Sequence, residues 1–357
     1  MKILYLITGL GVGGAERVVV DLATQMHLRG HQVKIIYLKG DVHVKPELAD
    51  IEVICIGLDN MLCILNSLNK FNSIVAEFKP DIVHAHMVHA NIFARISRLF
   101  KPFPRLICTA HNSNEGGKLR MLIYHFTNRF SDLNTNVSKE ATSRFIQMKA
   151  FDKNAIAVYN GVNLDKFKKN RMLNKADYIG TEKKVLLAVG RFNQQKDYPN
   201  LLTAVHKLKY EYNIDFQLII AGDGELRNKI QFDINRLHLE DNVILLGRRS
   251  DIPELMSIAD VFVLSSAWEG FGLVVAEAMA CECFVVATDC GGVKEVLGGH
   301  GLIVQPKDSD KLANALYRAL TIEESRKNLN NRKAIQYIKQ NFDLNKIVDD
   351  WIKLYEQ

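Results

Sequence analysis

The chain has 357 residues, of which 48% are hydrophobic and 24% charged, which is enough for two domains with sizeable cores. No apolar run reaches the ~18 residues needed to span a bilayer, and the first residues lack a secretory h-region, so we expect a cytoplasmic protein. The six cysteines form no Cys-x-x-Cys pair, which argues against a zinc site or a disulfide framework.

The net charge of +6 is unevenly distributed along the chain. Residues 1–170 carry 22 Lys and Arg against 14 Asp and Glu, a net +8, so the remainder carries −2. A basic first half indicates that this half meets an anionic surface or substrate. No nucleic-acid-binding motif accompanies the charge, so we expect no nucleic-acid partner.

The first half alternates strand-like apolar runs with helix-like periodicity, which is typical of a parallel, doubly wound sheet. The predicted strands are 3–7, 33–38, 51–55, 82–85, 106–109 and 133–137, and the predicted helices are 14–28, 61–78, 90–99, 118–130 and 139–148. Periodicity is lost near residue 160, and a polar, basic stretch at 166–177 follows as the predicted linker.

The second half repeats this alternation. Its predicted strands are 185–189, 217–221, 243–246, 261–264, 284–287 and 302–304, and its predicted helices are 199–210, 225–236, 252–258, 272–281 and 309–320, with a helical tail from about 323 to 355. We therefore predict an α/β fold of two Rossmann-like domains, residues 1–172 plus 342–357 and residues 173–341. Their parallel, doubly wound sheets are expected to face each other across a cleft.

Glycine-rich turns with charged residues follow several of these strands. Residues 9–14 match G-x-G-x-x-G at the start of a helix, where backbone amides can approach an anion. Arg191 and Lys196 share one strand-end loop and can both reach a diphosphate. Gly222 and Arg248 follow the next two strands, with Arg248 placed to lie beside a nucleotide base. This convergence of strand-end residues suits a nucleoside diphosphate.

Two carboxylates, Glu269 and Glu277, bracket a strand–turn–helix stretch at 268–280 that is otherwise apolar. With the glycine and cation motifs, this E-x7-E pair makes the chain resemble a retaining glycosyltransferase of family 4, which has the GT-B fold. The stretches 13–17 and 81–87 look like those of members that build bacterial surface polysaccharides, such as O-antigen, on polyprenyl diphosphate carriers.

The resemblance implies a donor site in the second domain. Arg191 and Lys196 would neutralise the donor diphosphate, Glu277 would bind the ribose hydroxyls, and Glu269 would hold hydroxyls of the donor sugar. The amides of Phe271, Gly272 and Leu273 would point at the sugar and the distal phosphate.

The resemblance also implies roles in the first domain. Gly14 would let the N-terminal loop close over the distal phosphate. His111 would contact the donor sugar near the reacting carbon, so Glu269 and His111 are the expected catalytic residues. Glu16, Arg17 and His86 are the expected acceptor-side residues.

Two patterns could suggest a metal site. Asp308-Ser309-Asp310 matches D-x-D but lies where a helix cap is expected. His84, His86 and His89 have no acid or cysteine at matching spacing. We therefore expect no metal and no cofactor, since cations can stabilise the leaving diphosphate.

The expected partners are a nucleotide sugar, UDP-linked, carrying a hexose or N-acetylhexosamine, and a lipid-linked saccharide acceptor. Residues 61–65 and 118–124 mix apolar and basic side chains and could lie on an anionic membrane, or they could be ordinary core helices. The first interpretation predicts peripheral contact with the cytoplasmic face of the inner membrane.

Two alternatives from other classes stay open. An NAD(P)-dependent sugar-nucleotide oxidoreductase would use the 9–14 loop, with Asp41 as the ribose-binding acid. A non-catalytic nucleotide-sugar binding protein would use the same donor residues without turnover.

Overall fold

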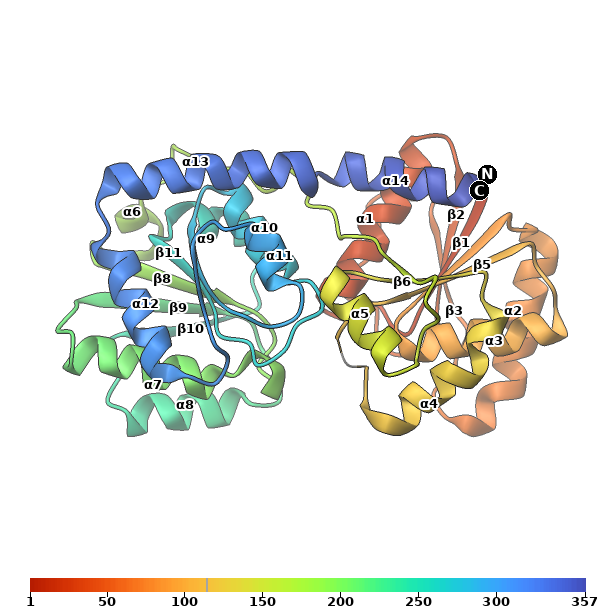
Figure 1. Ribbon diagram of the computed structural model, residues 1–357, viewed down its shortest axis with the longest axis horizontal. Coiled ribbons are helices and arrows are strands. Elements are labelled where there is room, and N and C mark those ends of the chain that lie inside the picture. Colours follow the sequence, from red (N-terminus) through yellow and green to blue (C-terminus); the bar gives the residue numbers. More distant parts are fainter. Residues whose placement is uncertain (114) are drawn as a thin grey trace. The chain divides into compact units, whose positions relative to one another are not determined.

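The computed structural model describes residues 1–113 and 115–357, with the side chain of Lys118 left undescribed. The chain forms two compact units, Met1–Gly161 with Asn345–Gln357, and Val162–Leu344 (Figure 1). The boundaries between units therefore fall at 161/162 and 344/345, where the sequence placed them at 172/173 and 341/342.

The first unit is built on a seven-stranded sheet in the order β3-β2-β1-β4-β5-β6-β7, in which neighbouring strands run parallel. The strands are β1 (Lys2–Ile7), β2 (Gln32–Tyr37), β3 (Glu52–Cys55), β4 (Ile82–His86), β5 (Arg105–Ala110), β6 (Leu133–Asn136) and β7 (Ile156–Ala157).

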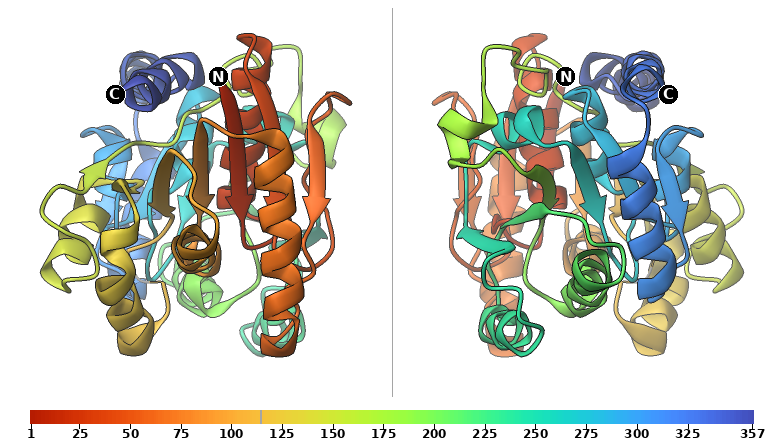
Figure 2. Two further views of the ribbon diagram at one scale, coloured as in Figure 1. Left: turned by 90° about the vertical axis from the view of Figure 1, so that its right-hand side faces the viewer. Right: turned by 90° about the vertical axis from the view of Figure 1, so that its left-hand side faces the viewer.

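Helices cover both faces of this sheet, as the left view of Figure 2 shows. They are α1 (Gly14–Leu28), α2 (Ile64–Phe78), α3 (Val88–Phe100), α4 (Gly117–Thr127), α5 (Lys139–Gln147) and α14 (Leu344–Glu356), with short 3-10 turns η1 (Met61–Cys63) and η2 (Asn128–Phe130). Leu4 and Leu6 of β1 pack with Phe71 of α2 and Phe93 of α3. Tyr5, between those leucines, points to the opposite face because side chains alternate along a strand.

The second unit has a six-stranded sheet in the order β10-β9-β8-β11-β12-β13. The strands are β8 (Lys184–Val189), β9 (Phe216–Ala221), β10 (Val243–Gly247), β11 (Val261–Leu264), β12 (Phe284–Thr288) and β13 (Leu302–Val304). The helices are α6 (Lys175–Ile179), α7 (Tyr198–Tyr210), α8 (Arg227–Arg236), α9 (Ile252–Ile258), α10 (Leu273–Ala280), α11 (Val293–Leu297), α12 (Ser309–Thr321) and α13 (Glu324–Asn341), with a 3-10 turn η3 (Gln194–Lys196). All six residues of β9 are buried, as expected for a strand covered on both faces.

The predicted pair of Rossmann-like domains with parallel, doubly wound sheets is confirmed. The elements that the sequence did not predict are among the shortest ones, such as β7, α6 and α11, of two, five and five residues, which are too short to show periodicity. The predicted helix at 61–78 begins as η1, which the Asn60 side chain caps by accepting a hydrogen bond from the Leu62 amide at 2.9 Å.

In each sheet the strand order reverses at one point, between β1 and β4 in the first unit and between β8 and β11 in the second. Loops after such strands diverge at the carboxyl edge of the sheet, and this is where open α/β sheets bind ligands. Within the described parts of the chain, no helix combines the length and the apolar character needed to cross a membrane.

Candidate active site

Glu269 lies in the loop after β11, at the point where the strand order of the second sheet reverses between β8 and β11. Its Oε1 is 2.6 Å from Lys196 Nζ and accepts a hydrogen bond from Ser266 Oγ at 2.7 Å. Its Oε2 accepts one from Gln195 Nε2 at 3.1 Å. The residue is only 7% exposed, and a buried carboxylate needs such partners to remain charged.

Backbone contacts also hold these two loops together. Gln195 O accepts a hydrogen bond from the Ala267 amide at 2.8 Å, and Lys196 O accepts one from Ser265 Oγ at 2.8 Å. The loops belong to β8 and β11, which are neighbours in the sheet although β9 and β10 separate them in the chain. Glu269 is therefore oriented by contacts with the turn that follows the adjacent strand β8.

Gly190 leaves the space that Lys196 needs to reach Glu269. A Cβ atom at position 190 would lie 2.8 Å from Lys196 Cε and 3.1 Å from its Cδ. The Lys196 amide donates to the Asn193 side chain at 3.2 Å, which shapes the turn. Arg191, on the same loop, is exposed, so its guanidinium lies at the surface beside the loop of the Lys196–Glu269 pair.

Gly222 allows the backbone of the loop after β9 to lie directly against the backbone of the loop after β8. Its φ is +151°, and a Cβ there would lie 1.9 Å from Gly190 O. The Gly190 amide donates to Ala221 O at 3.0 Å, and the Gly222 amide donates to Gly247 O at 2.8 Å. The next residue, Arg248, is exposed at the end of β10, so three neighbouring strand ends present their loops together.

The turn after Glu269 is held against the loop that follows β12. The Gly292 amide donates to Gly270 O at 3.1 Å, and a Cβ on Gly291 would lie 2.0 Å from Glu269 O. Gly272, with φ +84°, precedes the first turn of α10. The shape of this turn thus depends on glycines in two loops.

Helix α10 begins at Leu273, shortly after the buried Phe271. The first amides of a helix have no partner within it, and the helix dipole favours an anion there. Glu277 lies one turn further along α10 and is half-buried. The donor-side residues predicted from sequence therefore lie on neighbouring loops and on the first turns of α10, at one edge of the second unit.

The glycine loop of the first unit has two adjacent glycines with different surroundings. A Cβ on Gly13 would lie 2.4 Å from Glu16 Oε2, so the buried Glu16 side chain fills that side. A Cβ on Gly14 would meet no atom of the described residues within 4 Å. Arg17 is paired with Asp21, with Nε 3.2 Å from Oδ1.

His111 follows β5, and its imidazole contacts that of His86 at the end of β4. His86 Nδ1 lies 2.9 Å from His111 Nε2, and His86 is fully buried. The His111 amide donates to Glu115 Oε1 at 2.8 Å. Burial lowers the pKa of His111 to about 4 and raises the pKa of Glu115 to about 7.

Three functional candidates were missed by sequence reasoning, namely Gln195, Ser266 and Glu115. Gln195 adjoins Lys196, and Ser266 lies three residues before Glu269. Gln195 lies in the short turn η3 and Ser266 in a loop, and neither segment has a distinctive pattern, so their role is visible only from contacts. Nothing in the sequence indicates that Lys196 and Glu269 form an ion pair with each other.

Two residues of the patterns considered as metal sites, Asp308 and His84, have structural roles. Asp308 caps α12, where its side chain accepts a hydrogen bond from the Lys311 amide at 2.9 Å, so the predicted cap is confirmed. His84 is bonded to Tyr355 OH at 2.6 Å and to Thr109 Oγ1 at 2.7 Å. Across residues 1–113 and 115–357, no group of three or more His, Cys, Asp or Glu side chains is placed to hold a metal ion.

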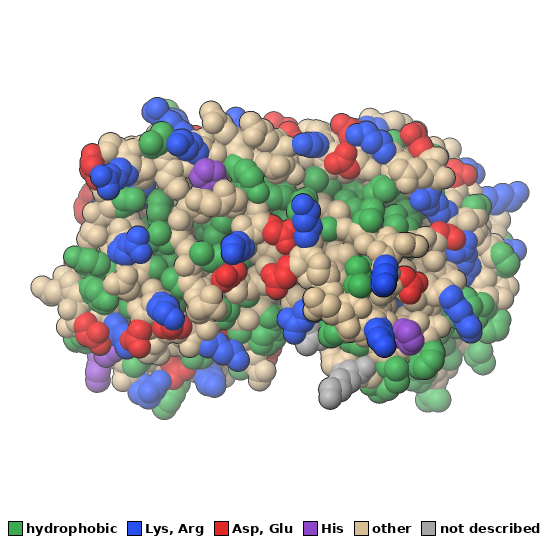
Figure 3. All heavy atoms as spheres, viewed as in Figure 1, with side chains coloured by type: hydrophobic (Ala, Val, Ile, Leu, Met, Phe, Trp, Pro, Cys, Tyr) green, Lys and Arg blue, Asp and Glu red, His purple; other side chains and the backbone are tan. Residues whose placement is uncertain are grey.

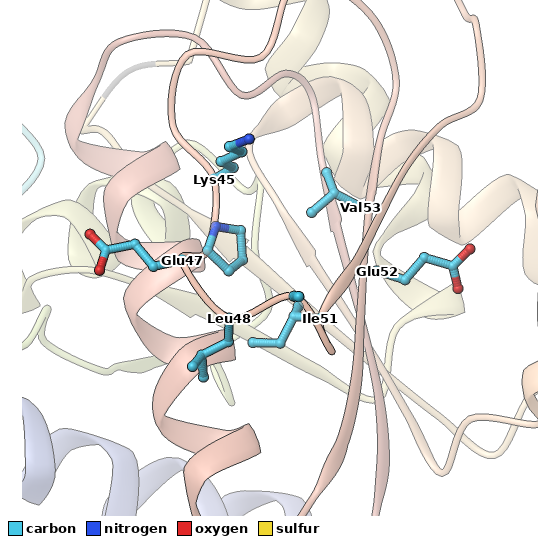
Figure 4. Close-up of a pocket in the computed structure, with 8 residues that line it drawn as sticks. Lys45, Glu47, Leu48, Ile51, Glu52 and Val53 are labelled. Atoms are coloured by element: carbon cyan, nitrogen blue, oxygen red, sulfur yellow. The ribbon is translucent and has the colours of Figure 1, made fainter.

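An open hollow of the first unit lies around β3 and the loop before it (Figure 4). Its charged side chains, Lys45, Glu47 and Glu52, point in different directions. None of the predicted site residues lines it. We therefore do not regard it as the active site.

Comparisons with known proteins identify the family to which this chain belongs. Residues 12–166 match the family model described as Glycosyltransferase Family 4, and residues 172–336 match that of Glycosyl transferases group 1. The chain is 26% identical to an N-acetyl-alpha-D-glucosaminyl L-malate synthase of Bacillus anthracis, over 96% of this chain and 94% of that protein. It is also 26% identical to an N-acetylgalactosamine-N,N'-diacetylbacillosaminyl-diphospho-undecaprenol 4-alpha-N-acetylgalactosaminyltransferase of Campylobacter jejuni, over 99% and 98%.

Among solved structures, Anabaena HepE in complex with UDP has a similar fold. The TM-score is 0.84 at 24% identity, covering the whole of both chains. Two family models thus account for most of the sequence, and the chain belongs to the glycosyltransferases of family 4, with the GT-B fold. The resemblance seen in the sequence is confirmed, and the protein is a glycosyltransferase.

Proposed function

We propose that this protein is a retaining glycosyltransferase that moves a hexose or N-acetylhexosamine from a UDP-sugar to a polyprenyl-diphosphate-linked saccharide, in the synthesis of a surface polysaccharide. The observation that carries the proposal is the buried Glu269, held by Lys196 at the switch point of the second unit. A relative that acts on a diphospho-undecaprenol acceptor and a similar fold that binds UDP support the choice of acceptor and donor.

In this proposal the second unit binds the donor. Arg191 and Lys196 neutralise the diphosphate, Glu277 binds the ribose, and Glu269 binds sugar hydroxyls. The amides of residues 271–273 contact the sugar and the distal phosphate, at the start of α10, where the helix dipole favours an anion. Gly222 and Arg248 shape the neighbouring loops, with Arg248 beside the base.

In this proposal Lys196 interacts both with Glu269 and with the donor diphosphate. Its ammonium is 2.6 Å from Glu269 Oε1, so it orients that carboxylate before the donor arrives. A bound diphosphate would share the same ammonium, since Lys carries three donors. Donor binding and the orientation of Glu269 are therefore coupled.

The first unit supplies the acceptor side. His111 contacts the donor sugar near the reacting carbon, Gly14 allows the loop to approach the distal phosphate, and Glu16 and Arg17 serve the acceptor. His86, expected from the sequence to bind the acceptor, is fully buried and contacts His111 instead, so that expectation is withdrawn. The acceptor hydroxyl bonds to the anomeric carbon on the face from which the diphosphate leaves. The carbon–oxygen bond to the diphosphate breaks, and a phosphate oxygen takes the hydroxyl proton, so this route requires neither metal nor cofactor.

The test is transfer from a panel of nucleotide sugars to lipid-diphosphate saccharides and, because of the malate-using relative, to hydroxy acids, with release of the nucleoside diphosphate as the readout. We expect Glu269→Ala or Arg191→Ala to abolish transfer, while Glu211→Ala, on an exposed residue after α7, leaves it unchanged. Full turnover in both site variants would refute the assignment. Turnover with hydroxy acids alone would reassign the acceptor.

We further propose that the first unit touches the cytoplasmic face of the membrane. Leu119, Leu122 and Phe126 form an apolar stripe on α4 with exposures of 72%, 50% and 64%. The exposed Arg120 lies beside them on the same helix. Figure 3 shows hydrophobic side chains gathered at the lower right, over α4 and its neighbouring helices. Apolar side chains with a basic neighbour suit an anionic lipid surface.

Co-sedimentation with vesicles checks this contact. Leu119→Glu with Leu122→Glu should weaken binding to anionic vesicles, whereas Leu329→Glu, at an exposed leucine of the second unit, should not. Equal binding by the wild type and both variants would contradict the proposal.

The two alternative functions receive less support. The oxidoreductase would need Asp41 at a ribose, yet this residue is exposed in the loop beyond β2, and membership of a glycosyltransferase family does not favour nicotinamide chemistry. A non-catalytic binding protein is distinguished by the same panel, since it would bind the donor without releasing the diphosphate.

A further inference from the structure

His111 is held at its ring and at its backbone by two different side chains. The ring nitrogen Nε2 lies 2.9 Å from His86 Nδ1, and the two ring centroids are 5.2 Å apart. The backbone amide donates to Glu115 Oε1 at 2.8 Å. His86 and Glu115 can therefore affect the protonation and the position of His111 without contacting the substrate themselves.

The contact between the two imidazoles requires one shared proton. Burial lowers the pKa of both rings, so both are neutral near pH 7 and each carries a single N–H. Either His86 donates from Nδ1 and His111 keeps its proton on Nδ1, or His111 donates from Nε2 and His86 keeps its proton on Nε2. The two arrangements give His111 opposite hydrogen-bonding properties at the nitrogen that His86 does not contact.

The surroundings of His86 favour the first arrangement. Its Nε2 is buried and finds no hydrogen-bond partner among the described residues. An orphaned buried N–H is rarer than an under-satisfied acceptor, so the proton belongs on Nδ1, where it has a partner. His111 then carries its own proton on Nδ1, as a hydrogen-bond donor suited to a sugar or phosphate oxygen.

Glu115 connects the His111 backbone to two helices. Its Oε2 accepts a hydrogen bond from Tyr124 OH of α4 at 2.7 Å. Asn91 of α3 donates to the same hydroxyl at 2.9 Å and to Thr109 O of β5 at 2.9 Å. The two residues after Glu115, Gly116 and Gly117, have φ values of +109° and +83°, which lets the chain turn at once into α4. One carboxylate therefore ties the His111 amide to α4 and, through Tyr124, to α3.

We propose that His86 and Glu115 are positioning residues for His111. His86 sets the ring tautomer with the proton on Nδ1, and Glu115 fixes the backbone amide of His111. The proposal rests on the catalytic role given to His111 above, but it concerns which side chains prepare that residue.

The ring tautomer can be measured without any turnover. Nitrogen-15 NMR of the histidine side chains of the full chain should show His111 protonated on Nδ1, and His86→Leu should change this to a mixture of tautomers. His86→Asn, whose amide nitrogen can occupy the place of Nδ1, should restore the wild-type signal. A His111 ring protonated on Nε2 in the wild type, or unchanged by His86→Leu, would overturn the assignment to His86.

Kinetics provide the second readout. We expect His86→Leu to lower kcat about 10- to 100-fold, the effect of removing residues that orient metal-binding histidines, with recovery in His86→Asn and little change in UDP affinity. Ser97→Ala is the control, since Ser97 is also fully buried in the first unit but its hydroxyl donates to Phe93 O within α3. That variant should lose stability without losing kcat. A parallel loss of kcat in both variants would mean that His86 acts only through the fold.

Glu115 is tested through the amide that it binds. Hydrogen exchange of the His111 amide should be at least about tenfold faster in Glu115→Ala than in the wild type, and Glu115→Gln, which keeps one acceptor oxygen, should stay close to the wild type. Unchanged exchange in Glu115→Ala would remove Glu115 from the proposal. If the wild type transfers no sugar from any donor, the proposed function fails, while the tautomer and exchange results still decide this inference.

Discussion

The pairing of Lys196 with Glu269 can be measured as a coupling free energy. Lys196→Met keeps most of the aliphatic stem that lies over Gly190 but removes the ammonium, and Glu269→Gln keeps the shape of the side chain but removes its charge. Combining the two variants isolates the interaction between the charges.

The burial of the pair sets the expected magnitude. The side chains of Lys196 and Glu269 are 17% and 10% exposed. Removing one partner of a buried pair costs ~3–5 kcal/mol, and partial hydration favours the low end, so we expect Lys196→Met to lose ~3 kcal/mol. Glu269→Gln leaves an ammonium that water can still reach, at a cost of ~1–2 kcal/mol, and the double variant buries no charge. The coupling free energy should therefore be roughly 2–3 kcal/mol.

The assay is urea unfolding followed by circular dichroism and by tryptophan fluorescence, since Trp268 adjoins Glu269 in the second unit. Gln194→Ala is the control, because Gln194 is exposed in the same turn and should change the unfolding free energy by less than ~0.5 kcal/mol. Single losses that add within ~0.5 kcal/mol would refute a direct ion pair.

Two further predictions concern the first unit. Gly14→Ala should leave the unfolding free energy nearly unchanged, because its Cβ would meet no described atom within 4 Å, but it should impair transfer if the loop closes over a phosphate; unimpaired transfer would exclude that closure. The first unit should also lose stability on acidification from about pH 6.5 to 4. The pKa values of His84, His86 and His111 are lowered by burial, so the unfolded state binds protons that the folded state excludes in this range. The raised pKa of Glu115 has the opposite effect on stability between pH 7 and about 4.5, because there the folded state binds a proton that the unfolded state has lost. Near pH 5.5 the unfolded state therefore binds about two more protons than the folded state, three at the histidines less one at Glu115. The unfolding free energy should fall by ~3 kcal/mol per pH unit there. An unfolding free energy that stays flat between pH 6.5 and 5, measured by urea unfolding, would contradict this burial.

Local patterns in the sequence were sufficient to predict most of the elements. Strands β11 and β13 begin and end at the predicted residues, because a buried parallel strand is a continuous apolar run bounded by polar or glycine residues. Helix α1 likewise has the predicted bounds, starting at the glycine loop. The spacing of Glu269 and Glu277 is also visible in the sequence, because one turn and one helix carry both residues. Fold class and family were therefore predictable.

What surrounds the reactive side chains was decided by tertiary structure alone. Lys196 meets Glu269 because the sheet order places β8 beside β11, although two strands and their helices lie between them in the chain. His86 meets His111 because β4 and β5 are adjacent and His86 stands opposite Thr109, two residues before His111. The sequence by itself determined the elements and the residue types at their ends, since those depend on near neighbours in the chain. It did not determine which ends meet, because that depends on the order of strands in each sheet and on burial, which removes water as the competing partner.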